Sequence, residues 1–305
     1  MFSKILIPLD GSKTAESAVP YARLLAETLD ADVELLAVID RGEIERSIAD
    51  PDALTEVVCY HTARFERYLS QVAEGFSGSR PQCRIEQGLA AERIIGAAAE
   101  SSESLIVMAS HGRSGIQRWL LGSVAEKVLR GTSNPLILVR ASAGDATERS
   151  AALGSVVIAL DGSELSERAL VPGLEIARSV NVEAVLARSF EFPTTAYYRA
   201  DDYPPSAAAF IPSYRELAEE MGRETREYLD AKVKEISASV PVQIRAEVLE
   251  GPAAERIIDL ARGTKGSLIV MCTHGCSGFK RWVLGSVAEK IARHAENPVL
   301  IIRAS

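Results

Sequence analysis

The sequence repeats itself, and this repeat constrains the fold more than any other feature. The segment His-Gly-Arg-Ser-Gly at 111–115 returns as His-Gly-Cys-Ser-Gly at 274–278, an offset of 163 residues from position 111 to position 274. The segments 118–119, 122–127 and 134–135 return at the same offset. A constant offset between several motifs indicates two copies of one structural unit. At 305 residues, each copy is long enough to bury a core of its own.

The two copies differ in length near the start of the second one. Leu-Asp-Gly-Ser at 9–12 matches 160–163, an offset of 151 from position 10 to position 161, whereas Gly88 matches Gly251 at the full offset of 163. The second copy therefore carries an insertion, and the Pro- and Tyr-rich stretch 192–214 is its natural place. Its prolines predict a long loop, which fits either a functional lid or a plain surface excursion.

The segment between the copies is small, polar and glycine-containing, as linkers are. We predict a first domain over residues 1–141, a linker over 142–153 and a second domain over 154–305.

Apolar runs and amphipathic stretches alternate along each copy, which predicts an α/β fold with a parallel sheet and right-handed crossovers. In the first copy, strands are predicted at 5–7, 33–39, 83–86, 105–108 and 136–139, and helices at 13–29, 54–72, 90–99 and 124–129. In the second copy, strands are predicted at 156–160, 184–186, 244–248, 268–271 and 299–302.

Composition excludes several classes of protein. The longest apolar runs are far shorter than the roughly 20 residues that cross a bilayer, so we expect no membrane span. A net charge of −8 argues against general electrostatic binding to nucleic acid. Four cysteines are too few for a disulfide framework in so long a chain, and no apolar leader precedes the first strand. We expect a cytoplasmic protein with reduced thiols.

The repeated motif forms a loop that could hold phosphate. A buried strand leads into Ser-His-Gly at 110–112, and nine residues later Gly122-Ser123 begin a helix. Glycines let backbone approach an anion, and a helix N-terminus offers N–H groups to it. No lysine follows Gly122, so the loop is not a Walker loop, and backbone N–H groups and hydroxyls would bind the phosphates.

These motifs resemble those of the universal stress protein family, in which a Gly-x2-Gly-x9-Gly-Ser/Thr loop follows the fourth strand. The Pro-Leu-Asp-Gly-Ser start, the Ser-His-Gly-Arg-Ser-Gly loop and the Leu-Gly-Ser-Val-Ala-Glu helix start carry the resemblance, which covers nearly the whole chain twice. It implies two tandem open five-stranded parallel sheets of strand order 3-2-1-4-5, Rossmann-like and similar to adenine nucleotide alpha hydrolases. Nucleotide would bind where strands 1 and 4 diverge, the location that open α/β sheets also favour on physical grounds.

The resemblance also implies the ligand and its contacts. The ligand would be ATP or another adenine nucleotide, with or without magnesium. Asp10 and Asp161 would contact the ribose, and backbone near Val38 would contact adenine; the second copy leaves this position open between Ala187 and Ser189. The positions implied in the first copy are Asp10, Gly11, Ser12, Val38, Gly88, Met108, Ala109, His111, Gly112, Arg113, Gly122, Ser123 and Val124. Those in the second copy are Asp161, Gly162, Ser163, Gly251, Met271, Cys272, His274, Gly275, Gly285, Ser286 and Val287.

One position departs from the family pattern. The first glycine of the family loop is Ala109 in the first copy and Cys272 in the second. Because Cys adds more bulk than Ala, we expect nucleotide at the first site rather than the second. Both sites could also be empty, as in the branch of the family that binds no nucleotide.

Several of these residues also have structural interpretations. Asp10 and Asp161 precede helices and could be N-caps. His111 and His274 could act as bases, although hydrogen bonding within the loop is the commoner role. Cys272 and Cys276 around His274 could suggest a metal site, but the first copy lacks these cysteines. Trp119 and Trp282 are expected to serve packing.

The last strand of each copy would lie at a sheet edge, and apolar edges tend to pair. In the family this edge mediates dimer contacts, so we expect the copies to meet there as a pseudo-dimer, with homodimerisation as a further option. The leading hypothesis is a stress-response sensor or regulator with slow ATP hydrolysis at most. The alternatives are an interaction protein with degenerate pockets and an unidentified protein partner, or a true hydrolase, which the lack of a phosphate-binding lysine disfavours.

Overall fold

A computed structural model describes residues 2–47, 50–78, 80–110, 121–140, 151–191, 214–264, 266–273 and 284–303. The first half contains β1 (Lys4–Pro8), α1 (Lys13–Glu16), α2 (Val19–Leu29), β2 (Asp32–Ile39), α3 (Arg41–Ser47), α4 (Pro51–Ala73), β3 (Gln82–Gln87), α5 (Ala90–Ala99), β4 (Ser104–Ala109), α6 (Ser123–Gly131) and β5 (Leu136–Val139). The second half contains β6 (Ser155–Leu160), α7 (Glu164–Glu167), α8 (Leu170–Ser179), β7 (Glu183–Phe190), α10 (Tyr214–Ser237), β8 (Ile244–Glu250), α11 (Ala253–Gly263), β9 (Ser267–Cys272), α12 (Ser286–His294) and β10 (Val299–Ile302).

Each half has the predicted parallel sheet. The strand order is β3-β2-β1-β4-β5 in the first half and β8-β7-β6-β9-β10 in the second, which confirms the order 3-2-1-4-5. The central strands β4 and β9 are buried along their whole length, because helices cover both faces of the sheet. The insertion predicted as a loop lies outside the described residues except for Tyr214, which begins α10.

One predicted helix is wrong. The stretch 13–29 forms two helices, α1 and α2, which are separated at Ser17 and Ala18. Pro20 has no N–H to donate to the carbonyl of Glu16, and its ring would clash with that carbonyl in a continuous helix. The second half breaks between α7 and α8 in the same way, and there Pro172 lies in the first turn of α8. The short helix α3 was not predicted.

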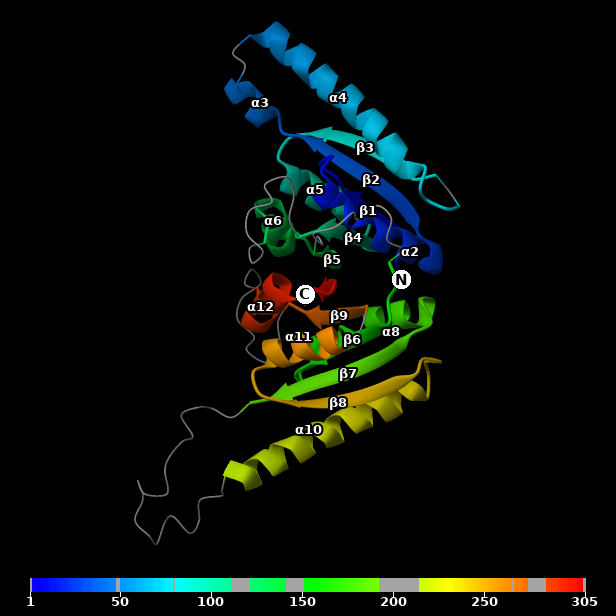
Figure 1. Cartoon of the computed structure of the whole chain (residues 1–305), viewed down its shortest axis with the longest axis vertical. Coiled ribbons are helices and arrows are strands. Elements are labelled where there is room, and N and C mark those ends of the chain that lie inside the picture. The colour runs from blue at the N-terminus through cyan, green and yellow to red at the C-terminus, as the bar shows by residue number, and fades with distance from the viewer. Residues whose placement is uncertain are drawn as a thin grey trace, which may run out of the picture.

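The two halves share one continuous sheet of ten strands (Figure 1). Strands β5 and β10 pair antiparallel, and Ile137, at the centre of the pairing, faces its own repeat counterpart Leu300. The predicted meeting of the two edges is thereby confirmed, and neither apolar edge is left exposed. Helices α2 and α8 lie side by side, with the Ser179 hydroxyl donating to the Thr28 hydroxyl at 3.5 Å.

A hydrophobic core covers each face of this sheet, and both cores run through both halves. Leu25 of α2 and Leu174 of α8 belong to one core, and Val128 of α6 and Ile291 of α12 belong to the other. The long helices α4 and α10 lie at the two outer ends of the molecule (Figure 1). Within the described ranges, no helix combines the length and apolar character that a bilayer crossing requires.

Candidate functional site

The carboxyl ends of β1 and β4 lie where the strand order reverses, because β1 pairs with β2 on one side and with β4 on the other. Asp10 follows β1 at this point, and Gly11 has a φ of 80°, a left-handed conformation that favours glycine. The backbone N–H and the hydroxyl of Ser12 both donate to Asp10 Oδ1, at 2.9 Å and 2.6 Å. The turn therefore holds the Asp10 carboxylate beside the carboxyl end of β1.

Ser12 is the N-cap of α1, and the alternative that Asp10 caps this helix is wrong. Ser12 Oγ accepts a hydrogen bond from the Ala15 N–H at 3.1 Å, while the Asp10 carboxylate accepts the hydrogen bond of the Ser12 hydroxyl. A capping side chain must lie directly before the helix, and Asp10 is two residues too early.

The second half reproduces this turn with the same distances. Asp161 Oδ1 accepts from the Ser163 N–H at 2.9 Å and from the Ser163 hydroxyl at 2.6 Å, and Ser163 caps α7 through the Ser166 N–H at 3.1 Å. Gly162 has a φ of 90°. Asp161, like Asp10, is therefore not a helix cap but a carboxylate presented beside the end of a strand.

The candidate phosphate loop is closed at its base by a backbone hydrogen bond. The Gly122 N–H donates to the Ser110 carbonyl at 2.7 Å, and the Gly285 N–H donates to the Thr273 carbonyl at 2.8 Å. The N–H of each N-cap glycine is thus used within the protein. Glycine has no side chain that could cap the first turn, so the donors offered to a ligand begin at Ser123 and at Ser286.

The middle of each loop, 111–120 and 274–283, lies outside the described residues. This applies to the predicted positions His111, Gly112, Arg113, His274 and Gly275, and to Trp119, Trp282 and Cys276. Among the residues that are described, no group of three or more His, Cys, Asp or Glu side chains is placed to hold a metal ion.

A pocket of about 280 Å³ occupies the crevice of the second half. It is lined by Ala159, Leu160, Asp161, Ser166, Ser189, Ala253, Ile257, Met271, Cys272, Thr273, Gly285, Ser286, Val287 and Ala288. Ala253 and Ile257 of α11 supply an apolar wall, while the first turn of α12 supplies N–H groups and the Ser286 hydroxyl. The pocket therefore combines an apolar wall with a polar, anion-favouring side.

Sequence reasoning missed seven of these lining residues, namely Ala159, Leu160, Ser166, Ala253, Ile257, Thr273 and Ala288. The repeat held a signal for two of them, because Ala253 and Ile257 recur at the full offset as Ala90 and Ile94 on one face of α5. A four-residue spacing of apolar side chains is also what any amphipathic helix shows, so the spacing alone does not indicate a ligand.

Strand register identifies the counterpart of Val38. Ile7 pairs with Leu35 in the first half, and its counterpart Ile158 pairs with Leu186 in the second. Counting three residues along each strand from these pairs leads to Val38 and to Ser189. Ser189, which lines the pocket, is therefore the structural equivalent of Val38, and Ala187 is not.

Cys272 lies in the pocket wall without filling the pocket. Its thiol donates to the Ser166 carbonyl at 3.8 Å, so the sulfur is directed toward α7. Burial is the main cause that raises the pKa of this thiol to about 12. Cys272 is thus a neutral thiol at physiological pH, and a volume remains open beside it. The preference for nucleotide at the first site stays a prediction.

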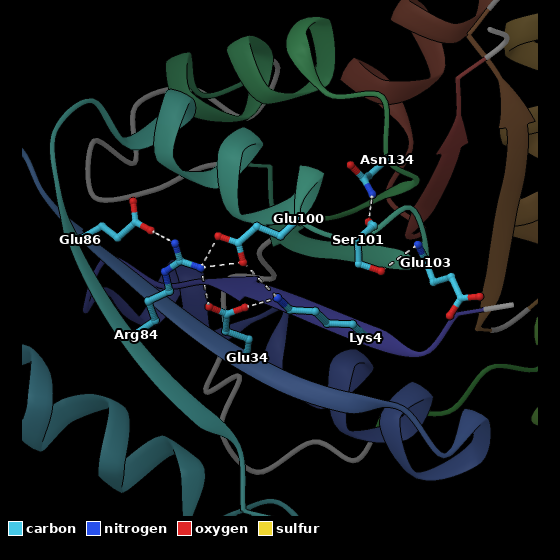
Figure 2. A network of polar contacts seen from close by, with 8 residues as sticks. All are labelled: Lys4, Glu34, Arg84, Glu86, Glu100, Ser101, Glu103 and Asn134. Carbon is cyan, nitrogen blue, oxygen red and sulfur yellow. Dashed lines mark hydrogen bonds and ion pairs between the residues drawn. The ribbon is translucent and has the colours of Figure 1, made fainter.

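A different polar cluster lies at the opposite, amino edge of the first half (Figure 2). The buried Glu34 carboxylate is 2.5 Å from Lys4 Nζ and 3.4 Å from Arg84 Nη1. Arg84 also bonds Glu100 at 2.8 Å, which is the largest cause of its raised pKa, and it pairs with Glu86. The cluster thus places two cations beside the buried Glu34 carboxylate.

The Asn-Pro motif that recurs in both halves has a structural role. Asn134 Nδ2 donates to the Ser101 carbonyl at 2.8 Å, joining the turn before β5 to the turn before β4 (Figure 2). Asn297 bonds the Ser267 carbonyl at 3.2 Å in the second half.

Comparison with known proteins identifies relatives over the whole chain. The model of the universal stress protein family matches residues 1–140 and 153–303. A universal stress protein of Mycolicibacterium smegmatis is 28% identical over 305 residues, which cover 98% of this chain and 96% of the relative. The universal stress protein MJ0531 of Methanocaldococcus jannaschii is 35% identical over 149 residues, which cover 48% of this chain and 81% of the relative.

Among solved structures, a universal stress protein from Archaeoglobus fulgidus has the same fold. It superimposes with a TM-score of 0.69 at 17% identity, and the alignment covers 100% of both chains.

Proposed function

Because the chain belongs to the universal stress protein family, we propose that it binds an adenine nucleotide in the crevices beside Asp10 and Asp161 and acts as a stress-response sensor or regulator. The observation that carries this proposal is the 280 Å³ pocket at the carboxyl ends of β6 and β9, at the point where the strand order reverses. Hydrolysis of the nucleotide is slow at most.

The chemistry of the pocket supports a nucleotide as ligand. The apolar wall of Ala253 and Ile257 suits the face of a purine, and the carboxylate of Asp161 suits the hydroxyls of a ribose. The N–H groups that begin at Ser286 suit phosphate oxygens, with the helix dipole of α12 adding a favourable field. A purine, a sugar and a phosphate chain need these three environments side by side.

The equivalent positions of the first half supply the same groups. Asp10, Ser123 and Val124 repeat Asp161, Ser286 and Val287, and Ala90 and Ile94 repeat the apolar wall. In the proposal, the loop glycines Gly112 and Gly275 complete the two phosphate sites, and magnesium accompanies ATP.

Calorimetric titration with ATP tests the proposal, after any nucleotide retained through purification has been removed and identified. Two matched variants separate the sites: Ala253→Phe fills the apolar end of the second pocket, and Ala90→Phe makes the equivalent change in the first half. A binding event that is lost in one variant and kept in the other belongs to the half that carries the substitution, and thermal unfolding verifies that the variants are folded.

The outcomes separate the alternatives. Loss of binding in Ala90→Phe alone would place the nucleotide in the first half, as the sequence predicts. The absence of both heat and retained nucleotide in the wild type, confirmed by equilibrium dialysis, would overturn the proposal and favour an interaction protein with degenerate pockets.

A further inference from the structure

The first half has a cavity at the amino edge of its sheet. The cavity has a volume of about 870 Å³ and is lined by the end of α2, the first residues of β1 and β2, and the turn between α4 and β3. The ion pair of Lys4 and Glu34, drawn in Figure 2, forms part of its wall. The side chains of Ala26, Val33 and Phe76 form an apolar part of it. None of these residues belongs to the candidate nucleotide sites.

Several carboxylates of this cavity have no partner. Glu27 lies in the last turn of α2, Asp30 is the C-cap of that helix, and Asp32 begins β2. Within the described part of the chain, these side chains make no hydrogen bond or ion pair. The last turn of α2 carries no basic residue. Because the carbonyls at a helix C-terminus favour cations, Glu27 and Asp30 lie where the helix dipole opposes them.

The second half carries the opposite charge at the end of the equivalent helix. The counterpart of Glu27 is Arg178, which lies in the last turn of α8, where a cation suits the helix dipole. The counterpart of Asp30 is the neutral Asn181, and both residues have a left-handed backbone, with φ of 53° and 55°. The two helices thus end in the same conformation with different charges.

The second half also pairs the carboxylate that begins its second strand. Glu183, the counterpart of Asp32, lies 2.9 Å from Arg245 Nε of the neighbouring strand β8. In the first half, Gln82 of β3 occupies the position of Arg245 and brings no charge. Both cations that neutralise this edge in the second half are therefore replaced in the first.

The cations that line the cavity do not balance these carboxylates. Arg23 Nη2 donates to the Val72 carbonyl at 3.4 Å, and Lys4 Nζ lies 2.5 Å from the Glu34 carboxylate. Arg80 is exposed at the rim. In the described ranges, none of these cations forms an ion pair with the carboxylates at the end of α2 or at the start of β2. The cavity therefore keeps negative charge that the protein itself leaves unbalanced.

We propose that this cavity binds a linear aliphatic polyamine, whose ammonium groups pair with Glu27, Asp30 and Asp32. A polyamine carries several positive charges joined by methylene chains, and the side chains of Ala26 and Val33 suit those chains. A metal ion fits less well, because no group of three or more His, Cys, Asp or Glu side chains among the described residues is placed to hold one. An extended cation can instead meet carboxylates that lie apart.

Equilibrium dialysis of the full chain, freed of nucleotide, against spermidine tests the proposal at low ionic strength, where exposed charges are least screened. Saturable binding is expected, and an equal concentration of magnesium chloride should not displace the polyamine. Two variants, Asp30→Asn and Glu27→Arg, each take the residue type of the equivalent position in the second half. Asparagine tolerates the left-handed backbone at position 30, as Asn181 shows.

The affinity for spermidine should fall about 2- to 5-fold in Asp30→Asn, as expected for the loss of one partly exposed ion pair. It should fall at least about 10-fold in Glu27→Arg, which removes an attraction and adds a repulsion. Glu66→Arg makes the same change of charge at an exposed position of α4 outside the cavity, and is the matched control. Its affinity should stay within about 2-fold of the wild type. Thermal unfolding verifies that the variants are folded.

Each result decides the matter. Equal weakening by Glu66→Arg and Glu27→Arg would overturn the site, because it indicates attraction to the overall negative charge of the chain. Displacement of spermidine by an equal concentration of magnesium would overturn it as well, because charge alone is then recognised. The same holds if the wild type shows no saturable binding, or if Asp30→Asn and Glu27→Arg bind spermidine as the wild type does. None of these outcomes bears on the proposed nucleotide function, which the ATP titration tests separately.

Discussion

Arg140 and Arg303 are repeat counterparts, and each extends from its own half to a helix end of the other. Arg303 Nη1 donates to the carbonyls of Thr132, at 2.7 Å, and Arg130, at 2.9 Å, and Arg140 Nη1 donates to the Ala295 carbonyl at 3.3 Å. Carbonyls at a helix C-terminus lack partners within the helix and attract cations. The two arginines therefore stabilise, in a pseudo-symmetric way, the junction of the two halves along β5 and β10, which we call the seam.

The helices α6 and α12 add ion pairs across the same seam. Arg293 Nη2 of α12 lies 3.4 Å from Glu126 Oε1 of α6. Arg130 Nη2 of α6 lies 3.7 Å from Glu289 Oε1 of α12. The helices α6 and α12 each begin at a candidate phosphate site, and these ion pairs connect the two helices directly.

We predict that Arg303→Ala destabilises the protein more than Arg140→Ala does. Arg303 makes two short bonds to carbonyls and Arg140 a longer one, and charge-assisted bonds are worth about 1.5–3 kcal/mol when shielded, less at this partly exposed seam. We expect a loss of about 1–2 kcal/mol for Arg303→Ala in urea unfolding. Arg41→Ala, in the exposed pair with Glu45, is the control and should change little. Equal effects at all three positions would contradict this assignment.

Lys4→Met should destabilise the first half, because it leaves the buried Glu34 carboxylate with Arg84 alone. Breaking one partner of a buried pair costs about 3–5 kcal/mol, and the remaining Arg84 contact reduces the expected loss to about 2–3 kcal/mol. Adding Glu34→Val, the residue type found at the equivalent Val185, should recover most of that loss. Denaturant unfolding measures both variants. A double variant no more stable than Lys4→Met alone would argue against the charge explanation.

Ser12→Ala and Ser163→Ala should each cost about 1 kcal/mol, because each removes an N-cap hydrogen bond and the hydroxyl that binds the preceding aspartate. Asp10→Asn should cost less than Ser12→Ala, because an amide oxygen still accepts from the serine. Thermal unfolding of the three variants gives the ranking, and a larger loss for Asp10→Asn would show that its charge, not its acceptor, supports the turn.

Replacing glycine by alanine should lower the free energy of unfolding at Gly162 and raise it at Gly96. Gly162→Ala forces a side chain into a φ of 90° and toward the Arg188 guanidinium, which should cost about 1–2 kcal/mol. Gly96→Ala lies within α5 with open space around the new methyl and should stabilise by about 0.5–1 kcal/mol. Unfolding free energies from urea titration test both, and a stabilising Gly162→Ala would refute the backbone argument.

Cys272 should resist alkylation while Cys59 reacts. The raised pKa of about 12 leaves almost no thiolate at pH 8, and the thiol is buried, whereas Cys59 is exposed. Iodoacetamide at pH 8 followed by peptide mass spectrometry should find Cys272 unmodified in native protein and modified in urea. Its reactivity should rise with pH toward 12. Rapid labelling of Cys272 in the native state would mean that the pocket wall opens.

Much of the fold follows from local patterns that repeat. Because the two copies carry the same apolar runs and glycines, the strands and their order could be predicted from the sequence with its family resemblance. Pro20 is also a local signal for the break between α1 and α2, although the apolar periodicity of 13–29 by itself predicts one continuous helix. Signals of this kind depend on residues that are close in the sequence, so they can be recognised without the structure.

The rest depended on which segments the fold brings together. The amino-acid sequence alone indicates two copies of one α/β unit, an aspartate after the first strand of each, and the meeting of the last strands. The three-dimensional arrangement was needed to show that Ser189 rather than Ala187 matches Val38, that Ala253 and Ile257 line the pocket, and that Arg140 and Arg303 each contact the other half. Strand register and contacts between distant segments are set by packing across the whole sheet, and a shift of one residue exchanges its faces without changing any local pattern.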